Sequence, residues 1–303
     1  MTSFGAYIRL MRPANIVTAI ADILMGFAAS GAVVLTFTHV RGDFPENGFE
    51  ILAWLILSTI GLYGGGVVFN DVFDADLDRV ERPERPIPSG KATIAGASLL
   101  GMLLLTVGIV AALQVSVVSA IIAAIVAGLA VLYDWKGKHH PVLGPINMGS
   151  CRGGNLLLGV SAIPAALEQL WFIAFIPIIY ISAITMISRG EVHGGSTKAL
   201  KGAVALYLIV FAGIASLALL PQFSLAYSLP FLALFAYLVF PPLFRAMPSP
   251  EPQFIMRAVK AGILALIVMN ASIAAGFAGW QYGLAVLLLL PVSMFMAKRF
   301  AVT

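Results

Sequence analysis

A dense run of charged side chains follows the second long apolar stretch of the sequence, between residues 70 and 90. Asn70, Asp74 and Asp78 are spaced four residues apart, which places three oxygen ligands along one face of a helix. Clustered carboxylates repel one another unless a cation neutralises them. Mg²⁺ takes oxygen ligands and binds through carboxylates together with substrate phosphates. The spacing therefore predicts a magnesium site at these three residues, with Asp71 in support, and we expect its aspartates to be catalytic.

Two arginines, Arg82 and Arg85, follow this acidic cluster within two helical turns. A guanidinium group matches the oxygens of a phosphate. The acids and arginines together predict a cradle for a metal-bound diphosphate. The Pro86–Gly90 segment then ends the helix, because proline cannot continue it. The alternative is a solvated loop whose acids and arginines pair only with one another.

The composition indicates which kind of fold positions these groups. Of the 303 residues, 60% are hydrophobic and 11% are charged, and the mean hydropathy is +0.98. A soluble domain carries about 25% charged residues, so this composition excludes an ordinary soluble fold. Long apolar runs predict an all-α bundle of transmembrane helices. We expect one domain over residues 1–303 with nine spans, or ten if the last run also crosses, at residues 14–36, 51–69, 94–113, 115–133, 142–165, 170–187, 203–220, 226–244, 258–277 and 282–296.

The Lys and Arg residues indicate how the bundle is oriented. Nearly all of them fall at the N-terminus and in alternate loops, whereas the opposite loops hold only Arg41. The positive-inside rule places the basic loops in the cytoplasm. We therefore expect an integral, multi-pass membrane protein whose N-terminus and acidic loop are cytoplasmic. The net charge of +4 then reflects topology, and no nucleic-acid motif accompanies it.

The fifth predicted span carries polar residues inside the membrane. Asn147, Cys151 and Asn155 share one helical face, and Arg152 lies about 100° away from Cys151. A charge within a span is expensive and marks a functional site. Arg152 is expected to hold either the diphosphate or an acidic acceptor, and the alternative is a structural ion pair with Asp22.

Several of these segments resemble one family. Asn70-Asp71-x-x-Asp74-x-x-x-Asp78, followed by Arg85-Pro86-Ile87-Pro88-Ser89-Gly90, resembles the first aspartate-rich motif of the UbiA superfamily of intramembrane prenyltransferases. Arg12-Pro13-x-Asn15 before the first span, the Tyr133…Lys136 pair after the fourth span and the number of spans are also similar to that family. The short gap between Asp78 and Arg85 is similar to the chlorophyll synthase side, and the fifth span resembles the EboC-like branch.

The resemblance implies a reaction and its substrates. Members bind an isoprenoid diphosphate through two aspartate-rich loops and Mg²⁺, ionise the allylic C–O bond and transfer the prenyl group to an acceptor, often an aromatic ring. The acceptor here is expected to be lipophilic, either aromatic or an alcohol. The first helix lines the central cavity in the family, so Asn15, Thr18 and Asp22 are expected to line the acceptor pocket. Further expected substrate contacts are Tyr133, Lys136, Asn147, Asn155 and Lys198.

The family's second acidic motif follows the sixth span, and the corresponding segment of this sequence differs from it. Residues 188–195 contain one carboxylate, Glu191. We expect Glu191 to be a metal ligand and a catalytic residue, with Lys198 or Arg189 supplying cationic charge, and the alternative is a solvated loop carboxylate. The allylic cation is expected to contact the aromatic faces of Phe69, Phe73 and Tyr133. Two other functions remain open: a non-catalytic protein that binds a lipid diphosphate, and a secondary transporter.

Overall fold

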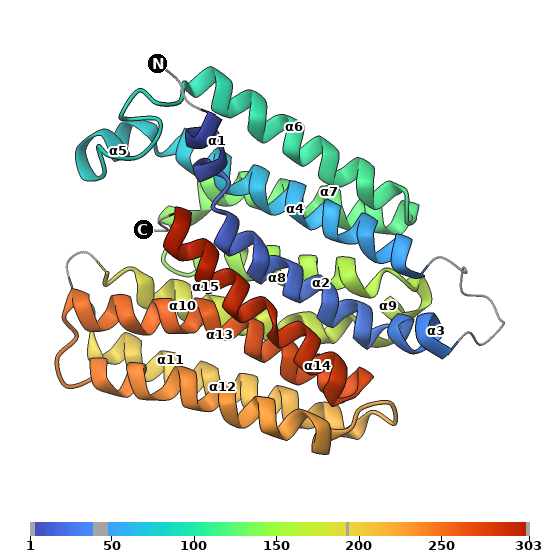
Figure 1. Cartoon of the computed structure of the whole chain (residues 1–303). Helices are drawn as coiled ribbons and strands as arrows, with labels where there is room; N and C mark the ends of the chain where they lie inside the picture. Colours follow the sequence, from blue (N-terminus) through green and yellow to red (C-terminus); the bar gives the residue numbers. More distant parts are fainter. Residues whose placement is uncertain (1–3, 39–47, 192–193, 301–303) are drawn as a thin grey trace.

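A computed structural model describes residues 4–38, 48–191 and 194–300, and these residues form helices joined by short turns (Figure 1). Arg41 lies outside the described residues. The helices run along the length of one bundle, with α4, α6 and α7 on one side and α11 and α12 on the opposite side (Figure 1). The elements are α1 Phe4–Leu10, α2 Pro13–Ala29, α3 Ala32–Thr38, α4 Gly48–Phe73, α5 Ala75–Glu81, α6 Ile94–Leu113, α7 Val117–Trp135, η1 Gly137–His139, α8 Leu143–Val160, α9 Pro164–Leu170, η2 Trp171–Ala174, α10 Phe175–Ser188, α11 Thr197–Ser216, η3 Leu217–Leu219, α12 Leu225–Ala246, α13 Pro252–Ala278, α14 Trp280–Leu287 and α15 Leu289–Phe300.

Eight helical segments among the described residues are long and apolar enough to cross a membrane, and a ninth is added if α1 and α2 form one bent span. The all-α membrane fold expected from the sequence is therefore confirmed. The predicted first span, 14–36, is wrong in its bounds. Its helix ends at Ala29, and the chain turns at Gly31, whose φ of +84° is a conformation that glycine adopts readily. The two helices of the bent pair meet at an angle of 44°.

The predicted fifth span, 142–165, corresponds to α8, which is less apolar than the eight segments. Its glycines, Asn155 and Arg152 lower its hydropathy, and most of its side chains are buried against other helices. Helix α8 packs against α2, α7 and α10. It therefore lies in the interior of the bundle, where protein replaces lipid as its surroundings.

Glycines allow the central helices to approach closely. A Cβ added to Gly159 of α8 would lie 2.5 Å from the Ile23 carbonyl oxygen of α2. Likewise, a Cβ added to Gly61 of α4 would lie 2.5 Å from the Leu104 carbonyl oxygen of α6. Small residues permit such approach in membrane bundles, where helix association depends on packing and interhelical hydrogen bonds. The α2–α8 and α4–α6 contacts fix the helices around the site described below.

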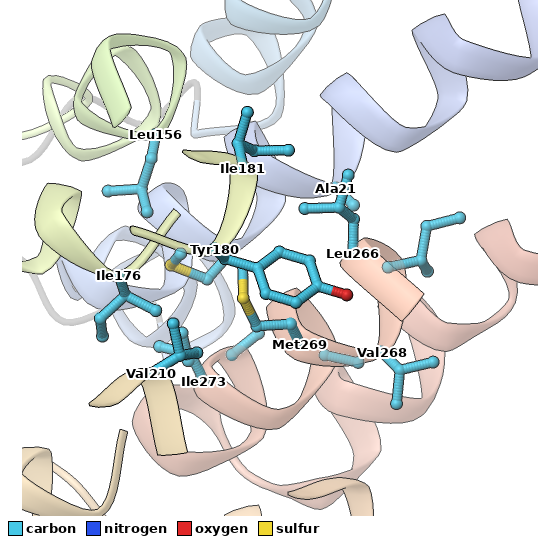
Figure 2. Close-up of a cluster of buried hydrophobic side chains, with 14 of the residues drawn as sticks. Ala21, Leu156, Ile176, Tyr180, Ile181, Val210, Leu266, Val268, Met269 and Ile273 are labelled. Atoms are coloured by element: carbon cyan, nitrogen blue, oxygen red, sulfur yellow. The ribbon is translucent and has the colours of Figure 1, made fainter. Parts of the chain in front are cut away.

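The largest buried cluster joins α2, α8, α10, α11 and α13 around Tyr180 (Figure 2). The Tyr180 hydroxyl donates to the Gly262 carbonyl oxygen of α13 at 2.9 Å, so its buried polar atom is satisfied. The Tyr180 ring also packs against Tyr207 and Phe235, with centroids 5.1 and 5.2 Å away. This cluster braces the helices that carry Asp22 and Arg152 from behind.

The acid-rich segment lies at one end of the bundle. Helix α5, helix α1 and the last turn of α15 gather at this same end (Figure 1). Thr93 caps α6 there, its Oγ1 accepting a hydrogen bond from Gly96 N at 3.0 Å. The short α5 and the turn after it are therefore held between the ends of α4 and α6.

Candidate functional site

A cavity of about 260 Å³ opens between α2, α4, α7 and α8, beneath the acid-rich segment. Its wall combines apolar side chains with polar groups at both ends. The lining residues are Arg12, Asn15, Leu62, Tyr63, Gly66, Val67, Asn70, Val126, Ala130, Tyr133, Asp134, Met148, Cys151, Arg152 and Asn155. Of the predicted site residues, Asn15, Asn70, Tyr133, Arg152 and Asn155 thus meet around one space. We call the end near Asn70 and Asp134 the mouth and the end near Arg152 and Asn155 the floor.

The acidic cluster keeps its helical spacing through the junction of α4 and α5. Asp74 N donates to the Asn70 carbonyl oxygen at 3.0 Å, and Asp78 N donates to the Asp74 carbonyl oxygen at 2.8 Å. The expected ladder of Asn70, Asp74 and Asp78 is therefore present along the backbone. Each of the three side chains, however, contacts a different partner.

Asp71 and Asp78 bind guanidinium groups. Arg12 Nη2 lies 2.6 Å from Asp71 Oδ1, and Arg85 Nη1 lies 3.4 Å from the same oxygen. Arg85 Nη1 also donates to Asp78 Oδ2 at 2.7 Å. Both carboxylates are nearly buried, so these contacts are screened far less than surface ion pairs. Arg85 therefore joins two members of the acidic cluster.

Asn70 and Asp74 contact α7 and the turn that follows it. Asn70 Nδ2 donates to Asp134 Oδ1 at 2.9 Å, and the Lys138 ammonium contacts Asp74 Oδ1. Lys136 points elsewhere: its ammonium lies 4.2 Å from the centroid of the exposed Trp135 ring. The lysine that reaches the acidic cluster is thus Lys138, two residues beyond the one expected.

The donor set at the mouth fits a magnesium ion that is shared with phosphate. No three His, Cys, Asp or Glu side chains converge as a ready metal cage within the described parts of the chain. Mg²⁺ needs no such cage, because one or two carboxylates, waters and substrate phosphates complete its shell. The oxygens of Asn70, Asp74 and Asp78 have the required chemistry. The Lys138 ammonium contacts Asp74 Oδ1, so this oxygen already has a cationic partner.

Arg12 has an unusual backbone conformation. Among the described non-glycine residues it is the one with positive φ, at 47°. It precedes Pro13, the first residue of α2, and a proline disfavours helical φ and ψ in the residue before it. A left-handed residue other than glycine is strained and persists where its surroundings fix it. The Arg12–Asp71 ion pair is the contact that fixes it here.

A buried polar network lies behind the floor, centred on Asp22, which is 0% exposed and, like Thr18, does not line the cavity. Asn155 Nδ2 donates to Asp22 Oδ2 at 3.0 Å, and Asn270 Nδ2 of α13 donates to Oδ1 at 2.7 Å. Arg152 Nε lies 3.0 Å from Asp22 Oδ2. The Arg152–Asp22 ion pair considered from the sequence is therefore formed, and both predicted residues belong to one network.

Other contacts fix Arg152 and Asn155 in place. Arg152 Nη2 donates to the Thr18 carbonyl oxygen at 3.0 Å, and Asn155 Oδ1 accepts from Thr59 at 2.7 Å. The Arg152 guanidinium carbon lies 5.6 Å from the Tyr63 ring centroid. Arg152 Nη1, in contrast, is buried without a hydrogen-bond partner among the described residues.

Asn147 and two of the three expected aromatic residues, Phe69 and Phe73, lie apart from this cavity wall. The Asn147 amide faces the α7 backbone, with its nitrogen 3.1 Å from the Leu129 carbonyl oxygen and its oxygen 3.2 Å from Tyr133 N. Phe69 faces Gly101 of α6, and Phe73 is exposed. Tyr63 and Tyr133 are the aromatic residues that line the cavity.

Glu191, Arg82 and Lys198 belong to the loops around the mouth. Burial raises the pKa of Glu191, while the positive charges of Arg82 and Lys260 act in the opposite direction. Glu191 is thus half-buried and within electrostatic reach of the arginine that follows α5. Lys198 is exposed near the start of α11, and the exposed Arg189 donates to the His140 carbonyl oxygen at 2.7 Å.

Sequence reasoning missed three residues of this site as functional groups: Arg12, Tyr63 and Lys138. Arg12 carried a signal, because it precedes a proline at the start of a helix. Lys138 follows Gly137, and a turn there returns the chain towards the acidic cluster. Tyr63 lies within an apolar helix and carries no local signal that distinguishes its role.

Comparisons with known proteins identify the family of this chain. The sequence model of the UbiA prenyltransferase family matches residues 23–248, most of the chain, and the chain therefore belongs to this family. Digeranylgeranylglyceryl phosphate synthase of Methanosarcina mazei is 30% identical over 230 residues, covering 71% of this chain and 78% of that protein. The Methanopyrus kandleri protein of the same name is 31% identical over 173 residues, covering 56% and 59%. The chain thus spans little more than half the length of several relatives, 53% for that of Thermococcus gammatolerans.

Solved structures show the same fold. One, described as giving insights into digeranylgeranylglyceryl phosphate synthase in membranes, has a TM-score of 0.65 at 20% identity and covers 91% of this chain and 98% of that one. A UbiA homologue from Archaeoglobus fulgidus bound to GPP and Mg²⁺ has a TM-score of 0.60 at 16% identity, covering 93% and 99%. The expected UbiA fold is confirmed, whereas the EboC-like and chlorophyll synthase affinities remain predictions.

Proposed function

We propose that this protein is a Mg²⁺-dependent intramembrane prenyltransferase that moves an isoprenoid group from a prenyl diphosphate to a lipophilic acceptor. One observation carries the proposal. The mouth of an intramembrane cavity gathers aspartates and their arginine and lysine partners from the start of α2, the end of α4, the α5 segment and the turn after α7. This combination suits an anionic headgroup at the surface and an apolar chain within the membrane.

The diphosphate binds at the mouth in this mechanism. Asn70, Asp74 and Asp78 hold the metal, and Glu191 contributes from the opposite loop. The bound metal supplies Lewis-acid stabilisation of the leaving diphosphate. Arg85 and Lys138 turn from the carboxylates to the phosphate oxygens, and Arg82 and Lys198 add positive charge nearby. Fixed cations of this kind stabilise the negative charge that develops as the C–O bond breaks.

The cavity receives the reacting end of the prenyl chain. Tyr63 and Tyr133 line it, and their rings stabilise an allylic cation by about 0.5–2 kcal/mol each. Apolar neighbours such as Leu62 and Val126 exclude water, which would otherwise capture that cation. Asn15 and Asn155 position the acceptor, and Asp134 at the mouth is placed to take its proton. The relatives' name, a digeranylgeranylglyceryl phosphate synthase, favours an alcohol over an aromatic acceptor.

The test is release of pyrophosphate from geranylgeranyl or farnesyl diphosphate by the purified protein in detergent, with and without Mg²⁺, across alcohol and aromatic acceptors. Release that depends on both Mg²⁺ and an acceptor, and is lost in Asp74→Ala, supports the transferase. Saturable Mg²⁺-dependent binding without release under any acceptor would instead support a non-catalytic lipid diphosphate-binding protein. The single carboxylate of the 188–191 segment is the feature that favours this second function.

We further propose that the mouth faces the cytoplasm. The basic residues of the loops at this end support that orientation under the positive-inside rule. A Ser89→Cys, Cys151→Ser variant gives an accessible label at the exposed turn before α6. Labelling of intact cells by a membrane-impermeant maleimide should fail until the cells are opened. Labelling without lysis would reverse the orientation.

A further inference from the structure

Two opposite charges compensate each other at the floor of the cavity and behind it. Asp22 accepts amide hydrogen bonds on both carboxylate oxygens, from Asn155 and Asn270, and contacts Arg152 Nε as well. These donors, together with the Arg152 guanidinium, stabilise the carboxylate form of Asp22. Arg152 is always protonated. The two groups are therefore a buried +1 and −1 with no net charge.

Two nitrogens of Arg152 lack a hydrogen-bond partner among the described residues: Nε, which contacts Asp22 as an ion pair, and Nη1, which has no such contact. Arg152 is 4% exposed and lines the cavity, and its Nη1 has no partner among the described residues. A buried donor without an acceptor costs free energy, so a ligand oxygen placed there is favoured. The remaining contacts of the guanidinium, to Asp22, Thr18 and the Tyr63 ring, keep it fixed.

We infer that the floor selects an acceptor whose inner end is uncharged and carries a hydroxyl or carbonyl oxygen, which accepts a hydrogen bond from Arg152 Nη1. The inference rests on the proposed function and narrows its acceptor class. A carboxylate at the floor would create a net negative charge far from water, since Asp22 already balances Arg152. A neutral oxygen satisfies the donor without adding charge. Arg152 and Asp22 together are thus specificity-determining residues.

The chain contains its own reporter of cavity occupancy. Cys151 is its one cysteine, is free, and lines the cavity beside Arg152. A ligand at the floor should slow the reaction of this thiol with methyl methanethiosulfonate in detergent. Mass spectrometry of the full chain measures the rate of that reaction. Three probes share one naphthalene ring: 2-naphthylmethanol, 2-naphthoate and 2-naphthylmethylammonium carry a neutral, an anionic and a cationic polar end of similar size. This measurement needs no turnover.

The wild-type protein should be protected by the alcohol at about one tenth of the concentration required of either charged probe. Asp22→Asn leaves the charge of Arg152 uncompensated. The naphthoate concentration required for protection should therefore fall about tenfold relative to that of the alcohol. The double variant Asp22→Asn, Arg152→Gln restores neutrality and should return the ratio to its wild-type value. Ser272→Ala removes a buried hydrogen bond to Ser228 between two residues that do not line the cavity, and it should leave the relative protection by the three probes unchanged.

Two results would overturn the inference. One is that naphthoate protects the wild-type protein as well as or better than the alcohol does. This test needs only the wild-type protein, so it holds even if Asp22→Asn does not fold. The other is an unchanged probe ratio in folded Asp22→Asn, which would leave Arg152 and Asp22 with a structural role alone. Failure of the proposed function is distinguishable: pyrophosphate release would be absent for all acceptors while the probe ratios still follow the charge of the floor.

Discussion

The ammonium group of Lys138 lies against the carboxylate of Asp74, a residue 64 positions earlier in the chain. The two side chains join the turn after α7 to the junction of α4 and α5. Both are less than one-fifth exposed, so the contact is largely shielded from solvent. Lys138 therefore acts as a tethered cation at a predicted metal ligand.

Lys138→Met should lower the Mg²⁺ concentration needed to bind a prenyl diphosphate. The tethered cation no longer competes for Asp74, and we expect the Mg²⁺ midpoint to fall about tenfold. The diphosphate affinity at saturating Mg²⁺ should also fall, because one phosphate partner is lost. Calorimetric titration with an unreactive prenyl thiodiphosphate measures both quantities. A higher Mg²⁺ midpoint would contradict this role.

Asp74→Ala and Asp78→Ala should each abolish Mg²⁺-dependent binding of the same thiodiphosphate. Each removes an oxygen ligand and frees a positively charged partner, Lys138 or Arg85. Asp76→Ala is the matched control on the same helix, because Asp76 is exposed and pairs only with the exposed Arg79. It should bind as the wild type does. Unchanged Mg²⁺ dependence in Asp74→Ala or Asp78→Ala would refute their assignment as ligands.

The left-handed backbone of Arg12 predicts that a glycine substitution is more stable than an alanine substitution, the reverse of their usual order in a helix. Arg12→Gly and Arg12→Ala both lose the ion pair with Asp71, but glycine relieves the backbone strain at φ 47°. Arg12→Gly should therefore unfold at a higher temperature than Arg12→Ala, by about 1 kcal/mol in unfolding free energy. Thermal unfolding in detergent gives the order. Equal stabilities would mean that the surroundings impose no strain there.

The buried pair at the floor predicts strong coupling in stability. Arg152→Met leaves the Asp22 charge without its cation and should destabilise the protein by about 3–5 kcal/mol. Adding Asp22→Asn to Arg152→Met removes the stranded charge and should recover much of that loss. A double-mutant cycle of unfolding free energies quantifies the coupling. Additive effects would show that the two charges do not stabilise each other.

Glu191 predicts opposite pH trends for binding and stability. Burial raises its pKa, against the influence of Arg82 and Lys260, so the folded protein binds a proton at pH values where the unfolded chain has lost it. Stability should therefore fall as pH rises from the ordinary glutamate pKa through the raised one. Metal-dependent binding should rise over the same window, because the ligand form is the carboxylate. Glu191→Gln should flatten both curves, and a pH profile of binding unchanged by that substitution would exclude Glu191 as a ligand.

The helices were predictable from the sequence because apolar runs of span length have few other solutions in a membrane. The breaks within these helices were less predictable from the sequence. The turn at Gly31 depends on one glycine in an otherwise apolar run, and α8 is embedded among other helices although its length resembles that of a span. The position of α8 depends on neighbours that are distant in the sequence.

The acidic cluster was predictable for a related reason: helical spacing is local, so Asn70, Asp74 and Asp78 could be placed from the sequence alone. The partners of those residues could not be. Arg12 meets Asp71 across 59 positions, and Asn270 meets Asp22 across 248. Choosing Lys138 over Lys136 depends on the path of a tight turn, which spacing does not encode.

The walls of the cavity all come from residues 12–155, whereas α10 to α15 lie outside it and supply Asn270 as a brace. The cavity-lining residues are thus confined to about the first half of the chain. Its later helices support the cavity from outside, as Asn270 of α13 does through Asp22. Substitutions on the outer faces of α11 and α12, which do not line the cavity, can change the lipid-facing surface without changing the cavity wall.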